Sequence, residues 1–292
     1  MTKSYDYLLG HPTLSVDPIF GYVMSKKENC LKLLQAALPK LNLTAIIRIA
    51  PQKHLSLKMF EQDSRYDIWS VDKQGRKYDI EIQTSSDPEI LERAWRYLLR
   101  LQTSVEPVLK PGEKRGPTHS SYVLFFCTFP PGKETRAKYS YSMHDDEFVD
   151  RRLDQLGHIV MFNALAPDRS MISAEMAEIL DFLVGKMRQQ PGKFIIGLNE
   201  LMTEYLNTQE WRDYMNDFQR YKEELSREKF NEGQAQGEAI GKAQERTIAV
   251  RKMAARLRKL HLSDTEIMQS LQEDYGSSFS EDQLLKFINN AK

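Results

Sequence analysis

The spacing of apolar side chains changes from helical to extended and back within the first third of the chain. Apolar positions recur near a 3.6-residue period from residue 18 to residue 38, after the cap Asp17-Pro18, and this predicts one helix. Four short segments rich in Ile, Leu, Val, Trp and Tyr follow, separated by turn residues, at 44 to 50, 54 to 60, 66 to 72 and 77 to 84. Helical spacing returns from residue 87 to residue 104. The pattern predicts a helix, an antiparallel meander and a second helix.

The middle of the chain changes from strands to helices. Residues 121 to 129 form a nearly continuous apolar run, which is typical of a strand buried on both faces, and residues 158 to 163 indicate another short strand. From residue 173 on the spacing is helical, through segments 176 to 187 and 199 to 227. The predicted fold class is therefore α/β, with an α-helical C-terminal extension.

The last sixty residues differ from the rest. Glycine recurs every fourth residue at 233, 237 and 241 in a polar stretch, which predicts a solvated or loosely self-associating helix and makes a homo-oligomer through this tail a candidate assembly. Six cations and no acid lie in 246 to 259, while six acids and no Lys or Arg lie in 261 to 285, so two helices of opposite charge could pair. Ser263 with Glu266, and Ser280 with Gln283, have capping-box spacing. We predict a core over residues 1–167, a helical extension over 168–230, and a tail over 231–292 that ends in a small helical module.

Composition narrows the class of protein. The 292 residues include 41 Lys and Arg against 41 Asp and Glu, which argues against a basic coat over the whole surface but leaves a local patch open. No uncharged apolar stretch approaches the ~20 residues of a membrane-spanning helix, so we expect no membrane partner. The first residues lack a signal-peptide pattern and two cysteines are too few for a disulfide framework, so the expected location is the cytoplasm.

Carboxylates gather on one face of the predicted hairpin at 66 to 84. Because side chains alternate along a strand, Asp79, Glu81 and Gln83 share a face, and a loop of Lys73-Gln74-Gly75 would bring Asp67 opposite Glu81 at about 5 Å. Grouped carboxylates repel one another unless a cation lies between them, and hard oxygen ligands favour Mg²⁺ or Mn²⁺. The alternative interpretation is an open, solvent-facing sheet face on which polar residues need no function.

These residues, with several motifs around them, resemble a known family. Asp67 and Glu81-Ile82-Gln83 are similar to the PD-(D/E)XK nuclease core, in the form found in the recombination-promoting nuclease and putative transposase family of prokaryotes. Further motifs resemble that family in the same order: Asp17-Pro-Ile-Phe20, Lys27-Glu28-Asn29, Arg93-Ala94 with Tyr97, 122 to 129, Met161-Phe-Asn163, 211 to 215 and the glycine-spaced tail. The resemblance extends from about residue 15 to about residue 245. It implies a PD-(D/E)XK nuclease-like core in which helices flank a mixed sheet.

The resemblance also implies an activity and a site. It assigns Asp67 and Glu81 as metal ligands, offers Glu28 as the third acid, and places Gln83 among the catalytic residues at the position of the motif's usual lysine. A lysine there can orient water and offset negative charge, whereas a neutral glutamine can only form hydrogen bonds. The implied function is a DNA endonuclease that hydrolyses phosphodiester bonds with Mg²⁺, or alternatively Mn²⁺ or Ca²⁺, and is linked to recombination or mobile elements. Glu28 could equally be a solvated helix residue.

Contact with DNA would be electrostatic under this hypothesis. The candidate phosphate ligands are cations on the second helix and in the proline-rich loop at 106 to 120: Arg93, Arg96, Lys110, Lys114 and Arg115. Each of them singly is also compatible with a solvated surface group. The competing hypothesis is a catalytically weak or inactive nuclease-fold scaffold that binds DNA or a protein partner. The complete set of Asp67, Glu81 and Gln83 favours the enzyme, because acids grouped without a metal destabilise a fold.

Overall fold

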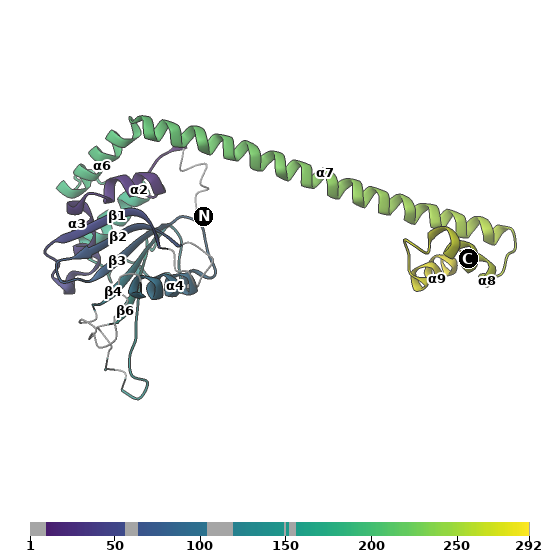
Figure 1. The fold of residues 1–292 in the computed structure, drawn as a ribbon, viewed down its shortest axis with the longest axis horizontal. Coiled ribbons are helices and arrows are strands. Elements are labelled where there is room, and N and C mark those ends of the chain that lie inside the picture. Colours follow the sequence, from purple (N-terminus) through teal and green to yellow (C-terminus); the bar gives the residue numbers. More distant parts are fainter. Residues whose placement is uncertain (1–9, 56–63, 104–118, 149, 152–155, 292) are drawn as a thin grey trace, which may run out of the picture. The chain divides into compact units, whose positions relative to one another are not determined.

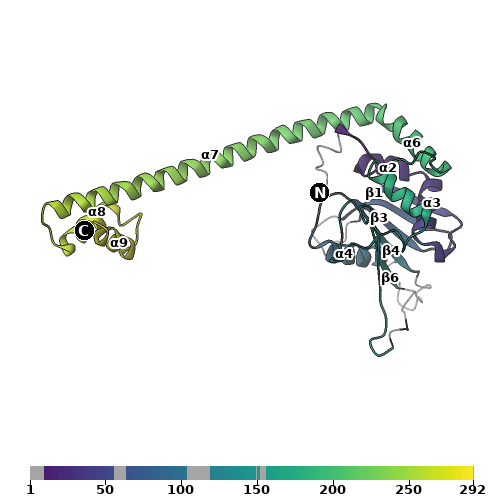
Figure 2. The ribbon, with the colours of Figure 1, turned by 180° about the vertical axis from the view of Figure 1, so that it is seen from behind.

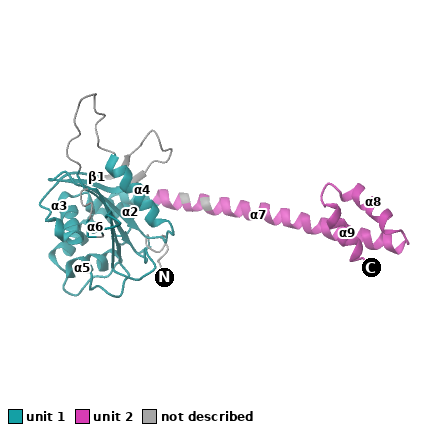
Figure 3. Cartoon of the chain, turned by 90° about the horizontal axis from the view of Figure 1, so that it is seen from below, with its two compact units in different colours: residues 1–215 teal, residues 216–292 magenta. Residues whose placement is uncertain are grey.

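The computed structural model describes residues 10–55, 64–103, 119–148, 150–151 and 156–291. The chain forms two compact units, residues 1–215 and residues 216–292 (Figure 3). The division falls within the long helix α7 (Gln209–Lys259), and so does the boundary predicted between residues 230 and 231.

The first unit is built on a six-stranded mixed sheet in the order β1-β2-β3-β4-β6-β5. The strands are β1 (Ile46–Leu55), β2 (Ser64–Asp72), β3 (Lys77–Gln83), β4 (Ser121–Cys127), β5 (Lys138–Ser142) and β6 (Gly157–Asn163). The first three form an antiparallel meander, β3, β4 and β6 run parallel, and β5 pairs antiparallel with β6 at one edge. The predicted α/β class, with helices flanking a mixed sheet, is confirmed.

Helices cover both faces of this sheet. Two helices, α2 (Asp17–Met24) and α3 (Lys27–Ala37), lie on one face, and α4 (Ile90–Thr103) lies on the other (Figures 1 and 2). Two further helices, α5 (Ala174–Leu183) and α6 (Lys193–Leu206), pack with α3 and α2. The sheet therefore has no open face at its centre, and β4 is buried along its whole length as the sequence predicts.

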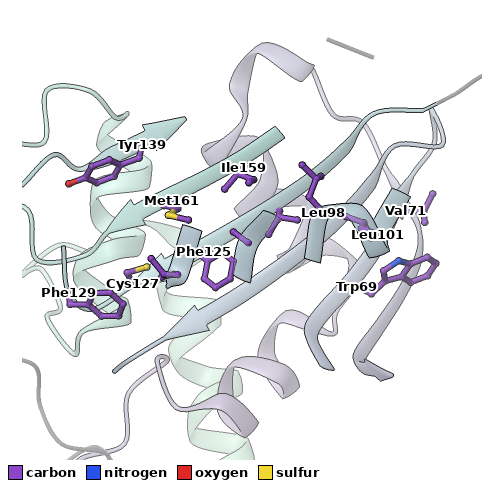
Figure 4. Close-up of a cluster of buried hydrophobic side chains, with 13 residues drawn as sticks. Trp69, Val71, Leu98, Leu101, Phe125, Cys127, Phe129, Tyr139, Ile159 and Met161 are labelled. Atoms are coloured by element: carbon purple, nitrogen blue, oxygen red, sulfur yellow. The ribbon is translucent and has the colours of Figure 1, made fainter. Parts of the chain in front are cut away.

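Apolar side chains fill the space between α4 and the sheet (Figure 4). The helix contributes buried residues at helical spacing, strands β2, β4 and β6 contribute alternate residues, and β5 contributes one. The buried members are Ile90, Ala94, Leu98 and Leu101 from α4, with Trp69, Val71, Val123, Phe125, Cys127, Ile159, Met161, Tyr139 and the following Phe129. By the same alternation Asp79 and Glu81 of β3 belong to this face, so acids project toward an apolar layer.

The structure corrects two predicted boundaries in the first part of the chain. The single helix predicted from 18 to 38 is broken after Met24, where the Ser25 hydroxyl donates to the Tyr22 carbonyl and the Asn29 amide donates to the Val23 carbonyl. These side chains satisfy carbonyls at the end of a helix, so neither Gly nor Pro is needed to stop it. The segments predicted as separate strands before and after Pro51 are continuous through residue 55 in one strand, β1, which tolerates proline because it is at the edge of the sheet; residues 56–60 of the second prediction lie outside the described residues.

Two later elements also differ from the prediction. Strand β5 was not predicted, although Lys138-Tyr-Ser-Tyr-Ser142 alternates and buries Tyr139 against the core. The helix predicted from 199 to 227 is divided between α6 and α7 at Asn207-Thr208, where the Thr208 hydroxyl accepts the N–H of Trp211. Threonine at this position begins the new helix as an N-terminal cap.

The second unit ends in a small three-helix module. The C-terminal part of α7 packs with α8 (Asp264–Tyr275) and α9 (Glu281–Asn289) around the buried residues Val250, Ala254, Ile267, Leu271, Leu284 and Ile288. Both predicted capping boxes are confirmed. The two charged segments meet through this apolar core and an ion pair between Arg258 and Asp264.

Helix α7 has a long exposed stretch. Residues 226–240, which include Gly233 and Gly237, are exposed to solvent throughout. The prediction of a solvated helix is therefore confirmed for this stretch, and self-association through it stays a prediction. No helix in the described part of the chain is long and apolar enough to cross a membrane.

Candidate active site

The β2–β3 hairpin has the register expected for the loop Lys73-Gln74-Gly75. Ile68 lies opposite Ile80 and Val71 opposite Lys77, and this register extends to Asp67 opposite Glu81. The turn closes because Gly75 adopts a positive φ of 79°, which favours glycine, and donates its N–H to the Asp72 carbonyl. The backbone therefore places Asp67, Asp79 and Glu81 on one face, with Asp67 and Glu81 further from the turn than Asp79.

Two hydrogen bonds join Asp67 to β3. The Asp67 N–H donates to Glu81 Oε1 at 3.1 Å, and the Ile82 N–H donates to Asp67 Oδ2 at 2.8 Å. Each carboxylate thus accepts a backbone N–H of the neighbouring strand, so the two side chains are fixed against each other. The cross-strand pair predicted from the sequence is present.

The acids are buried, so the interpretation as an open, solvent-facing sheet face is wrong. Asp79 is 0% exposed and Glu81 is 5% exposed, because α4 and the apolar residues of β4 cover this part of the sheet. Asp79 lies beside Val123 and Glu81 beside Phe125 in the parallel ladder. A carboxylate among such neighbours loses its hydration, and the apolar side chains offer it no hydrogen bond in compensation.

Asp79 has no donor for either of its carboxyl oxygens among the described residues. Its near neighbour on this face is another acid, Glu81, so a proton shared between the two carboxyls is the way in which Asp79 can be satisfied. Burial, with repulsion from neighbouring acids, raises the pKa of both Asp79 and Glu81 well above the ordinary range.

Asp67 belongs to the same electrostatic cluster. The pKa of Asp67 is raised to about 7, with burial as the largest cause and the charge of Asp17 adding to it, while the Ile82 N–H and the Arg93 guanidinium act in the opposite direction. Burial also raises the pKa of Asp17 itself. We call Asp17, Asp67, Asp79 and Glu81 the acid cluster.

Asp17 is the acid that sequence reasoning missed. The sequence shows it as the helix-starting residue before Pro18, and the structure places it in the first turn of α2, close enough for its charge to act on Asp67. Glu28, the acid named from the resemblance, is exposed in the first turn of α3. Asp17 is part of the motif Asp17-Pro-Ile-Phe20 that resembles the family. The sequence pattern accounts for Asp17 as the start of a helix and does not indicate a second role at the site.

Arg93 lies beside the acid cluster and contacts Gln83. One guanidinium nitrogen, Nη2, donates to Gln83 Oε1, and the other, Nη1, pairs with Asp87 at 3.0 Å. The Gln83 amide also donates to the Ser85 carbonyl at 3.1 Å, which fixes its orientation. Arg93, predicted from the sequence as a DNA ligand, is thus three-quarters buried at the site, with 25% of its side chain exposed.

The other predicted DNA ligands are not brought to the site by described contacts. Arg96 is exposed on α4, and Lys110, Lys114 and Arg115 lie outside the described residues. Their role in binding DNA stays a prediction.

A cavity of about 460 Å³ lies beside the opposite flank of α4. It is lined in part by Leu91 and Trp95, which are two residues out of phase with Arg93 and Tyr97 on the helix and therefore point to the other side. None of the acid cluster lines it. The chemistry of the acids and the shape of this cavity therefore belong to different places in the fold.

The donors of the acid cluster match a hard divalent cation in chemistry. Carboxylate oxygens are what Mg²⁺ and Mn²⁺ bind, and the two unsatisfied oxygens of Asp79 show a deficit of positive charge. No three His, Cys, Asp or Glu side chains in the described ranges are already arranged to hold a metal ion. The backbone hydrogen bonds to Asp67 and Glu81 engage Oδ2 and Oε1, so a cation would bind through the other oxygen of each carboxylate.

Comparisons with models of protein families, with curated proteins and with solved structures found no match for this chain.

Proposed function

We propose that this protein is a metal-dependent DNA endonuclease with a PD-(D/E)XK nuclease-like core, linked to recombination or mobile elements. The observation that carries the proposal is a group of buried acids joined across two strands, with Asp79 left without a hydrogen-bond donor among the described residues. A fold gains nothing in stability from such a group, because burying charged carboxylates together is unfavourable. Its presence supports a functional role that requires concentrated negative charge.

Asp67 and Glu81 would hold the divalent cation, Mg²⁺ by preference, and Asp17 is a better candidate than Glu28 for the third acid. A bound Mg²⁺ would supply Lewis acidity and lower the pKa of a coordinated water. The protein itself positions the two carboxylates, because the hydrogen bonds between β2 and β3 hold Asp67 and Glu81 at a fixed separation. Such preorganisation avoids reorganisation during the reaction.

The reaction is hydrolysis of a phosphodiester. The oxygen of a water molecule bonds to phosphorus while the bond from phosphorus to one ester oxygen breaks. The attacking water loses a proton to solvent, and the departing oxygen takes one up. Negative charge grows on the phosphate oxygens during this change, so a cation beside the acid cluster would stabilise the transition state.

A plasmid-nicking assay with and without Mg²⁺ tests the function. We expect the wild type to nick DNA only with the metal, and Asp67→Ala and Glu81→Ala to reduce the rate by a factor of about 100 or more, the usual scale for losing a directly acting group. Both variants should stay folded, because each removes a carboxylate from a mutually repelling group. Full activity in either variant would contradict the assignment, and an inactive wild type would favour the scaffold hypothesis.

A further inference from the structure

The acid cluster needs a cation that can face the phosphate, and the position where the PD-(D/E)XK motif usually has lysine is occupied by Gln83. A glutamine amide carries no charge, so hydrogen bonding is all that it can contribute. The structure places the Arg93 guanidinium in direct contact with the Gln83 side chain. Positive charge is therefore present at this position, but it comes from α4 and not from β3.

The Arg93 side chain is held from several sides. Gln83 accepts from one terminal nitrogen and Asp87 from the other, while the guanidinium carbon lies 5.4 Å from the ring centre of Phe125 and 5.8 Å from that of Tyr97. Arginine on an aromatic surface, with acceptors at both ends of its planar fork, loses little further freedom when it binds a ligand. The charge is thus positioned before any substrate arrives.

Arg93 also has a hydrogen-bond donor that the described contacts do not use. Its Nε atom is buried and has no hydrogen-bond partner among the described residues. Its charge reaches the acid cluster, where it opposes the rise in the pKa of Asp67 and of Asp79. Arg76 differs in this respect, because its Nε and both terminal nitrogens donate, to Asp72, Leu41 and Gln74.

We propose that Arg93 is the catalytic cation of this site and that Gln83 is the residue that positions it. Arg93 would contact the non-bridging oxygens of the scissile phosphate, and it would stay protonated throughout, since arginine does not release its proton in proteins. This inference rests on the proposed endonuclease function and adds to it the origin of the positive charge. It predicts that glutamine in β3 and arginine in α4 act as one unit.

The test compares single and double variants of the full-length protein in single-turnover cleavage with Mg²⁺. We expect Arg93→Gln to lower the cleavage rate by a factor of about 100, the scale of losing one donor to a developing negative charge. In the double variant Gln83→Lys with Arg93→Gln the charge returns from the β3 side, and we expect it to recover at least a factor of about 10 relative to Arg93→Gln. A merely structural arginine would not be rescued in this way.

A matched control is Arg136→Gln. Arg136 also pairs with an acid, Glu134 at 2.8 Å, and lies 4.8 Å from an aromatic ring centre, that of Tyr139, but it is outside the acid cluster. We expect the rate of this variant to stay within a factor of about 2 of the wild type, because its charge does not act on the site. A fall comparable to that of Arg93→Gln would overturn the inference by showing a general effect of losing such an arginine.

Arg93→Lys keeps the proposal testable if Arg93→Gln does not fold. It retains a charge but loses the fork that reaches Gln83 and Asp87 together, so we expect a folded protein whose rate falls by a factor of about 10. Wild-type rates in Arg93→Gln or Arg93→Lys, or no recovery in a folded double variant, would overturn the role of Arg93 and leave the endonuclease function standing. A wild type without Mg²⁺-dependent cleavage would overturn both.

Discussion

The two ends of the β2–β3 hairpin both contain buried carboxylates, but the groups that surround these carboxylates are of opposite kinds. At the turn, Asp72 is fully buried and accepts four hydrogen bonds, from the Gln74 and Arg76 N–H groups, from Arg76 Nε at 2.5 Å and from the Tyr78 hydroxyl at 2.7 Å. Further along β3, in the acid cluster, Asp79 is equally buried and has no donor among the described residues. One acid is paired with a cation and the other is placed beside further acids.

This difference distinguishes Asp72, which stabilises the fold, from the acid cluster, which lowers the stability of the fold. A buried carboxylate with a complete set of donors stabilises the turn, and removing it leaves those donors without an acceptor. Carboxylates that raise one another's pKa lower the stability of the folded protein, so their presence indicates a function that favours retaining them. The same residue type in one hairpin can therefore be assigned to structure or to function by counting donors.

The largest expected effect comes from making the same substitution at both ends. Asp72→Ala should lower the free energy of unfolding by about 3 to 5 kcal/mol, because it leaves Arg76 and Tyr78 with buried donors unpaired. Asp67→Ala should leave the metal-free protein at least as stable as the wild type, because it relieves repulsion. Urea denaturation of both variants at pH 8 without metal measures the difference, and equal losses would remove the distinction between the two ends.

The pH dependence of stability should come from the acid-cluster end. The folded-state pKa of Asp67 is raised from 3.8 to about 7, so between these values the folded protein binds more protons than the unfolded chain. Stability of the metal-free protein should therefore fall as the pH rises from about 4 to about 7, with a contribution from Asp67 of about 4 kcal/mol at ~1.4 kcal/mol per pKa unit.

Asp67→Asn isolates that contribution, since the difference between wild type and variant removes the effect of other titrating groups. We expect the variant to show the shallower decline. Added Mg²⁺ at pH 8 should raise the melting temperature of the wild type and leave that of Asp67→Asn almost unchanged, because a ligand stabilises only the state that binds it. A wild type whose stability rises over this pH range would contradict the burial of Asp67 as the cause.

The smallest expected effect is at Asp79. Asp79→Asn removes one buried charge and gives Glu81 an amide donor, so the metal-free protein should become more stable by about 1 kcal/mol at pH 8. Thermal unfolding monitored by circular dichroism is sufficient to measure it. Destabilisation by a similar amount would show that the Asp79 carboxyl has a stabilising partner and belongs with Asp72.

Local sequence was sufficient for the hairpin. Gly75 supplies the positive φ that the turn requires, and the alternation of residues 78 to 83 fixes which side chains face the same way, so the pairing of Asp67 with Glu81 followed from a count of residues. The capping boxes at Ser263 and Ser280 followed in the same way. These features depend on neighbours within a few residues, which the sequence lists in order.

Features that apolar periodicity does not encode, or that depend on distant segments, could not be obtained in this way. The break between α2 and α3 depends on side chains of Ser25 and Asn29 that replace backbone partners, and no periodicity reveals this. The burial of Asp79 depends on α4, which packs on the sheet from another part of the chain. The sequence predicted that this face of the hairpin is polar, and the packing of α4 on the sheet buries it.

The sequence by itself determined the α/β class, the hairpin register and the acids that share its face, because strand alternation and turn chemistry are local. Only the tertiary structure decided that Asp17 acts on Asp67, that Arg93 reaches Gln83, and that Arg76 rather than a metal satisfies Asp72. Burial and charge pairing are set by which segments meet in space. Two acids of identical sequence character therefore differ in role because one meets an arginine and the other meets more acids.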